Sequence, residues 1–175
     1  EEGIPVIEIT LRAAGALEGI KRIKSEMPGM AVLAGTVLTK GQIDDAVAAG
    51  VNGIVTPGLD SEIVEYCQKQ NVPVTPGCST ATEISQAAKM ELEVIKYFPA
   101  ELNGGIAALK LFHGPFPNLQ FIPTGGIDFS NLGSYLANPF IAACGGSYMA
   151  KSADIIGCNW DLIRSNCRKC IDISL

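Results

Sequence analysis

No cluster of Lys and Arg occurs anywhere along the 175 residues, and the 13 basic side chains are outnumbered by 18 acidic ones. The formal net charge is −5 at pH 7. Proteins that bind nucleic acid concentrate positive charge on one face, so this composition argues against a nucleic-acid partner. It favours a small-molecule partner instead.

A long uninterrupted apolar segment is missing as well. Residues 129–150 contain no charged side chain, but Asn138-Pro139 and Gly145-Gly146 interrupt them. Such pairs are typical of loops and buried strands, not of a helix that spans a bilayer. The sequence begins without Met and without a basic or apolar leader segment. We therefore expect no membrane association and a cytoplasmic location.

Few potential metal ligands are grouped together. Histidine occurs once, as His113, and the six cysteines are irregularly spaced. Cys167 and Cys170 have the spacing of a zinc-ligand pair, but no second pair accompanies them. We expect reduced thiols and no metal or other cofactor.

What the sequence does contain is a regular alternation of β-rich and helical segments. The β-rich runs are residues 4–10, 30–37, 53–58, 72–77, 93–99, 119–126 and 141–149. The helical segments are residues 13–26, 40–49, 60–69, 81–90, 105–112, 131–137 and 160–169. Helix N-termini are expected at Thr39, Asp60, Thr80 and Asp128. This alternation is typical of right-handed βαβ units around a parallel sheet.

Seven such units are one fewer than a closed β/α barrel needs. We interpret residues 1–175 as a single domain of the α/β class, a parallel β/α (TIM-type) barrel that lacks its first, N-terminal βα unit. The length supports one sizeable core and is too short for two ordinary domains. Two alternatives stay open: a doubly wound sheet, and a tail over residues 170–175 that fills the gap as a strand.

Two charged side chains stand inside apolar runs. Lys96 lies within residues 93–99 and Glu8 within residues 4–10. Because strands alternate with a period of two, each shares a strand face with apolar residues, and we expect both to be buried. Opposite charges on two strands of one barrel can form a structural ion pair or a catalytic pair.

Small residues mark the ends of the β-rich runs. They are Gly35-Thr36, Pro57-Gly58, Pro76-Gly77, Thr124-Gly125-Gly126 and Gly145-Gly146-Ser147. In β/α barrels the carboxyl ends of the strands hold the active site, and the loops after the last two strands commonly bind phosphate. Glycines there allow backbone N–H groups to converge on an anion, although a single Gly-Gly pair is more often a tight turn.

Motifs in a fixed order carry a resemblance to a known family. They are IEITLR (7–12), AGTVLT (34–39), TPG (56–58), PGCST (76–80), KYFPAE (96–101), GPFPN (114–118), PTGGI (123–127) and GGSYM (145–149). Together they resemble the 2-keto-3-deoxy-6-phosphogluconate (KDPG) and 4-hydroxy-2-oxoglutarate (KHG) aldolases, up to about Ala153. The resemblance implies a class I aldolase that cleaves KDPG to pyruvate and glyceraldehyde 3-phosphate, and KHG to pyruvate and glyoxylate. It also implies a phosphorylated keto-acid substrate and a homotrimer.

The resemblance implies catalytic roles for two residues, with Lys96 forming a Schiff base and Glu8 acting as general base and proton shuttle. Nine more residues match positions that bind substrate: Arg12, Thr36, Pro57, Phe98, Thr124, Gly125, Gly126, Gly146 and Ser147. Burial of an amine suits this chemistry, because only the neutral form attacks a keto group and burial penalises the charged form.

This sequence departs from the family pattern at several points. The family's first strand is absent, Leu33 replaces a glycine, and Ala13 follows Arg12 where threonine is common. Two other functions therefore stay open: a non-catalytic barrel fragment that binds a phosphate ligand, and another phosphosugar enzyme such as an isomerase.

Overall fold

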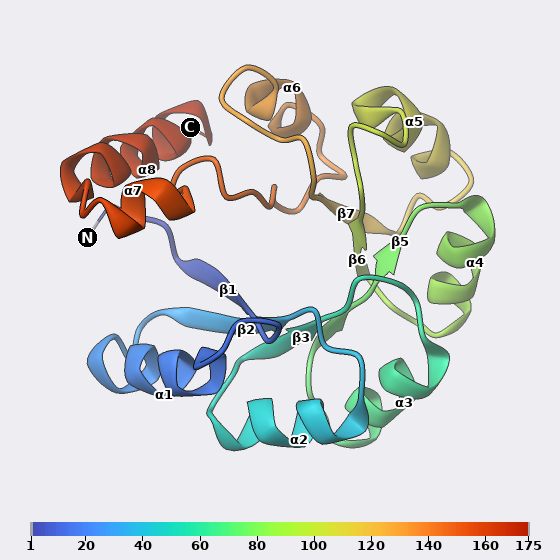
Figure 1. Cartoon of the computed structure of the whole chain (residues 1–175). Coiled ribbons are helices and arrows are strands. Elements are labelled where there is room, and N and C mark those ends of the chain that lie inside the picture. Colours follow the sequence, from blue (N-terminus) through green and yellow to red (C-terminus); the bar gives the residue numbers. More distant parts are fainter. Residues whose placement is uncertain (1, 175) are drawn as a thin grey trace. The chain divides into compact units, whose positions relative to one another are not determined.

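The computed structural model describes residues 2–174, which form two compact units of alternating strands and helices (Figure 1). Pro5–Cys78 makes one unit, and the rest of the described chain makes the other. All the strand pairs within each unit are parallel, as the alternation of segments predicts. That residues 1–175 form a single domain stays a prediction.

The unit Pro5–Cys78 contains a four-stranded parallel sheet with the order β1-β2-β3-β4. The strands are β1 (Val6–Thr10), β2 (Ala31–Gly35), β3 (Gly53–Val55) and β4 (Val74–Thr75), and the short β5 (Gly77–Cys78) follows. The helices are α1 (Ala16–Glu26), α2 (Lys40–Ala48) and α3 (Ser61–Lys69).

The core of this unit lies on one face of the sheet. Val32, Ala34 and Ile54 are buried there and pack with Ile20 of α1 and Ile43 of α2. Burial of an aliphatic side chain of this size contributes roughly 1.5–3 kcal/mol. The alternate residues of β2 have the opposite parity, so they present the other face of the sheet.

The second unit contains the parallel pair β6 (Val94–Tyr97) and β7 (Gln120–Pro123). Its helices are α4 (Ala81–Lys89), α5 (Gly105–His113), α6 (Leu132–Leu136), α7 (Ser152–Ile156) and α8 (Trp160–Ser174). Ile95, Tyr97, Phe121 and Leu109 are fully buried, and Tyr135 is 1% exposed. Burial alternates with a period of two along β7, whereas in β6 the consecutive residues Ile95, Lys96 and Tyr97 are all buried.

The seventh expected strand, residues 141–149, is not a continuous strand. Two isolated bridges stand in its place, Phe121 with Ile141 and Thr124 with Gly145, and the register slips by one residue between them. Pro123 lies between the two bridges, and it has no N–H with which to continue the ladder. The prediction of a full strand here is wrong for this reason.

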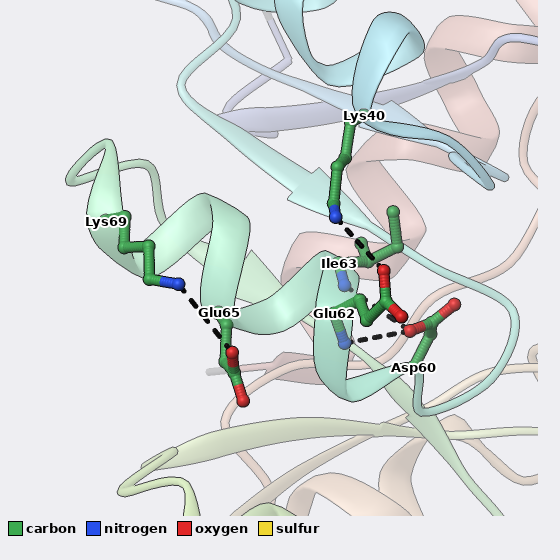
Figure 2. Close-up of polar contacts among 6 residues, drawn as sticks. All are labelled: Lys40, Asp60, Glu62, Ile63, Glu65 and Lys69. Carbon is green, nitrogen blue, oxygen red and sulfur yellow. Dashed lines mark hydrogen bonds and ion pairs between the residues drawn. The ribbon is translucent and has the colours of Figure 1, made fainter.

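Three of the four expected helix starts are confirmed, at Thr39, Asp60 and Thr80, whose side chains accept backbone N–H bonds. Figure 2 shows Asp60 accepting bonds from the N–H groups of Glu62 and Ile63 at the start of α3. Asp128 is not a cap, because the N-cap of α6 is Asn131 and the Asp128 carboxylate instead accepts bonds from Ser130.

The C-terminal segment is more helical than expected. Helix α7 was not anticipated, and α8 continues to Ser174. The alternative in which residues 170–175 supply a strand is therefore wrong for Cys170–Ser174, and Leu175 lies outside the described residues. Among residues 2–174 no helix has both the length and the apolar character that crossing a membrane requires.

The first turn of α4 gives a test that depends on pH. Oε2 of Glu83 accepts bonds from the N–H groups of Ser79 and Thr80, at 2.8 and 2.9 Å, and from the Thr80 hydroxyl at 2.8 Å. Burial alone would raise the pKa of Glu83, but these donors hold it below its ordinary value. The carboxylate therefore adds stability above the ordinary glutamate pKa of about 4.3, and this is lost as pH falls through the lowered pKa.

We expect Glu83→Gln to lower the free energy of unfolding by about 1 kcal/mol at pH 7, because an amide oxygen accepts the same bonds more weakly. Urea unfolding at pH 7 and at several values below pH 4 measures the difference between the two proteins. That difference should shrink as the pH falls, and an equal difference at every pH would contradict the explanation.

Candidate active site

Lys96 is held within the buried core strand β6. It is 9% exposed, and its neighbours Ile95 and Tyr97 are fully buried with the opposite parity. Its Nζ lies 5.4 Å from the centroid of the Phe98 ring, within the range of a cation–π contact. The expectation of a buried lysine in this strand is confirmed.

Phe98 connects the lysine to a glycine turn. The ring also lies so close to Gly125 that a Cβ on that glycine would be 3.3 Å from two ring carbons. The Ser79 hydroxyl donates a 2.8 Å bond to the carbonyl oxygen of Phe98. The Phe98 side chain, 37% exposed, therefore lies close both to the Lys96 amine and to the backbone of Gly125.

The glycine turn continues the pairing of β6 and β7 past the ends of both strands. Thr124 N–H donates to Tyr97 O at 2.9 Å, Ala100 N–H to Thr124 O at 2.9 Å, and Glu101 N–H to Gly125 O at 3.1 Å. Gly125 and Gly126 have φ values of 95° and 82°, a left-handed conformation that favours glycine. The turn after β7 is thus bonded to the turn after β6.

The second expected glycine pair lies beside the first. Gly145 bridges Thr124, and a Cβ on Gly145 would be 2.8 Å from the Thr124 hydroxyl oxygen. Gly146 and Ser147 follow and are exposed. The structure therefore places the five expected phosphate-site residues in one unit, in two neighbouring segments of which one contacts Phe98 through Gly125.

The remaining expected site residues belong to the unit Pro5–Cys78. Glu8 lies on β1 and pairs in register with Leu33, on the sheet face opposite the apolar core. Its carboxylate lies over Gly35, because a Cβ there would be only 2.0 Å from Glu8 Oε1. Glu8 is exposed, so the expectation of burial is wrong for it; β1 is the edge strand of its sheet and pairs only with β2.

Arg12, Thr36 and Pro57 each follow the carboxyl end of one strand in this sheet, after β1, β2 and β3 respectively. Arg12 is exposed in its turn. Thr36 has a φ of 59°, which is rare for a β-branched residue and costs on the order of 1–3 kcal/mol. Pro57 lines a cavity of about 230 Å³. Backbone strain maintained at such a position is common in functional sites.

Some residues around the site were missed. Ser79 bonds to the carbonyl group of Phe98, and the Glu101 carboxylate accepts a hydrogen bond from Tyr135. Glu101 stands in a quoted motif, but its partner is 34 positions away, and no local pattern indicates such a pair. Within residues 2–174 no group of three potential metal ligands occurs.

Comparison with known proteins identifies the family. The model of the KDPG and KHG aldolases matches residues 1–166. A 2-dehydro-3-deoxy-phosphogluconate aldolase of Haemophilus influenzae is 42% identical over 173 residues, which cover 99% of this chain and 82% of the relative. The chain belongs to the KDPG and KHG aldolase family.

Solved structures of aldolases from this family resemble the chain closely. A KDPG aldolase of Legionella pneumophila, with pyruvate captured as a covalent carbinolamine, has a TM-score of 0.92 at 38% identity and covers 95% of this chain and 81% of its own. A Zymomonas mobilis KDPG aldolase with 3-phosphoglycerate has a TM-score of 0.88 at 36% identity and covers 97% and 79%. These matches confirm the expected fold class, a parallel β/α structure of the TIM type.

Proposed function

We propose that the protein is a class I aldolase that cleaves KDPG to pyruvate and glyceraldehyde 3-phosphate through a Schiff base on Lys96. The observation that carries the proposal is a buried lysine beside an aromatic ring and a double-glycine turn, all in one unit. The names of the H. influenzae and L. pneumophila relatives support the substrate, and the carbinolamine in the latter supports a covalent route.

The chemistry uses the lysine as an electron sink. The neutral amine of Lys96 adds to the C2 carbonyl of the substrate, and loss of water gives a protonated imine. The C3–C4 bond then breaks, its electron pair moves toward the imine, and the C4 hydroxyl loses its proton to become the aldehyde. Protonation of the resulting enamine at C3 and hydrolysis release pyruvate and restore the amine.

We propose Glu8 as the group that accepts the C4 hydroxyl proton and later returns a proton to C3. A carboxylate is suited to both transfers because it acts as base in one and as acid in the other. Support comes from the IEITLR motif and from the placement of the Glu8 carboxylate over Gly35 on the non-core face of its sheet. In this role Glu8 must reach the substrate that Lys96 holds.

The other expected residues would bind the two anionic ends of the substrate. Arg12 and Thr36 would hold the pyruvyl carboxylate, since a planar guanidinium binds carboxylates bidentately, and Pro57 would line the site beside them. Gly125, Gly126 and Ser147, with Thr124 and Gly146 beside them, would bind the phosphate through backbone N–H groups and the serine hydroxyl. The bound 3-phosphoglycerate of the Z. mobilis relative supports a phosphorylated ligand.

The family name also supports KHG as a second substrate, with glyoxylate as its aldehyde product. A homotrimer and a cytoplasmic location stay predictions. A non-catalytic phosphate-binding protein and a phosphosugar isomerase remain the rival functions, and neither forms an imine with pyruvate.

Trapping of the imine separates these functions. Incubation with pyruvate and borohydride should reduce the Schiff base to a stable amine and add mass only to the peptide that contains Lys96. Lys96→Met should abolish the adduct, whereas Lys110→Met, at an exposed lysine on α5, should leave it intact. An adduct on another lysine, or none on the folded wild-type protein, would refute the mechanism.

Gly35→Ala tests the role of Glu8 without changing its chemistry. The new Cβ would lie 2.0 Å from Glu8 Oε1, so the carboxylate must move away. General acid–base catalysis contributes about 10²–10⁴-fold, so we expect kcat to fall at least about 100-fold. Gly29→Ala is the matched control, because a Cβ on Gly29 meets nothing within 4 Å and should leave kcat unchanged.

Thermal unfolding should show that both glycine variants fold, since the clash at Gly35 involves the end of a flexible side chain. Unchanged kcat in folded Gly35→Ala would show that the position of the Glu8 carboxylate does not matter for the reaction.

A further inference from the structure

Glu101 and Tyr135 form a hydrogen-bonded pair for which the proposed mechanism has no use. Glu101 stands in the turn after β6, and Tyr135 on α6 donates its hydroxyl proton to Glu101 Oε1. Tyr135 is 1% exposed. Its pKa is raised by burial and further by the Glu101 carboxylate, so the phenol keeps its proton at neutral pH.

The Glu101–Tyr135 pair occupies space that is free only because two neighbouring residues are glycines without a Cβ. A Cβ on Gly126 would be 2.6 Å from both Cβ and Cγ of Glu101. A Cβ on Gly105 would be 3.0 Å from Glu101 Oε1 and 3.1 Å from the Tyr135 hydroxyl. The stem of Glu101 therefore packs directly on the backbone of Gly126, and its carboxylate lies beside Tyr135 of α6 and Gly105 at the start of α5.

The same turn is fixed from two more directions. Glu101 N–H donates to the carbonyl of Gly125 at 3.1 Å, and Asn131 Nδ2 donates to the carbonyl of Gly126 at 2.9 Å. Asn131 is the N-cap of α6, one turn before Tyr135. Helix α6 thus contacts the Gly125-Gly126 turn directly through Asn131 and indirectly through Tyr135 and Glu101.

We propose that Glu101 and Tyr135 are positioning residues that set the distance between the phosphate-binding turn and Lys96. The inference rests on the proposed function. Lys96 and Glu101 are joined by five peptide bonds along one short segment, and Glu101 packs on Gly126, so the pair links the reacting amine to the phosphate site. A displacement of about 1 Å at a group that orients the substrate can cost on the order of 100-fold in rate.

This role makes a selective prediction. Loss of the Tyr135–Glu101 hydrogen bond should impair the cleavage of KDPG, whose phosphate and imine must be held at a fixed distance from each other. It should not change the rate at which Lys96 forms an imine with pyruvate, because pyruvate has no phosphate. We expect Tyr135→Phe to raise KM for KDPG about tenfold with a smaller change in kcat, and to leave the rate of pyruvate trapping on Lys96 within about twofold of wild type.

Glu101→Ala provides a second variant, at an exposed position in the turn after β6. It removes both the acceptor and the stem that packs on Gly126, so KM for KDPG should rise at least as much as in Tyr135→Phe. Glu101→Gln keeps the stem and an oxygen acceptor, and KM should return to within a few-fold of wild type.

Tyr97→Phe is the matched control. It also removes a buried phenol hydroxyl, one that donates to the carbonyl of Asn103 and not to Glu101. It should lower the melting temperature much as Tyr135→Phe does, without raising KM for KDPG relative to the trapping rate.

The outcomes separate this inference from the proposed function. A wild-type protein that neither cleaves KDPG nor traps pyruvate overturns the function and this inference together. Suppose instead that the wild-type protein cleaves KDPG and traps pyruvate. The inference alone is then overturned if Tyr135→Phe and Glu101→Ala slow trapping and cleavage to the same extent, or if they slow neither reaction. A rise of KM in Tyr97→Phe equal to that in Tyr135→Phe would do the same, because it would assign the effect to general loss of packing.

Discussion

The parallel pairing of β6 with β7 is the constraint on which the positions of Lys96 and of the Gly125-Gly126 turn depend. Its register places Lys96 opposite Ile122 and Tyr97 opposite Pro123. Three further backbone bonds extend the pairing into the turns that follow, as far as Glu101 and Gly125. Because parallel strands end at the same edge of a sheet, the backbone pairing brings the strand that carries Lys96 and the Gly125-Gly126 turn together.

Burial then decides what the lysine can do. The opposite face of β6 is filled by fully buried Ile95 and Tyr97, and Lys96 is itself only 9% exposed. Its amine also lies within cation–π range of the Phe98 ring. A lysine therefore stands in a core strand where an apolar side chain would pack well, and such departures from the core pattern are common at functional sites.

Local sequence rules predicted much of this arrangement, and they failed where it depends on contacts between residues that are far apart in the sequence. Thr39, Asp60 and Thr80 were recognisable as helix starts because a cap depends on the next three residues, and Lys96 was recognisable because strand parity is local. The strand expected after Pro139 failed because a proline in the neighbouring strand interrupts the ladder. The exposure of Glu8 depends on β1 being an edge strand, which its own residues do not reveal.

The glycines show why the sequence predicted only part of the candidate site. Their occurrence at strand ends suggested that glycine is needed there because it exposes backbone N–H groups that can bind phosphate. The structure adds a second reason: at Gly35 and Gly126 the absence of a Cβ makes room for the carboxylate side chains of Glu8 and Glu101. A glycine that is needed for space is specified by its partner across the fold, not by its neighbours in sequence. At Gly35, whose backbone is not left-handed, a substitution moves the Glu8 carboxylate while leaving its chemistry intact; at Gly126, with a φ of 82°, it would strain the backbone as well.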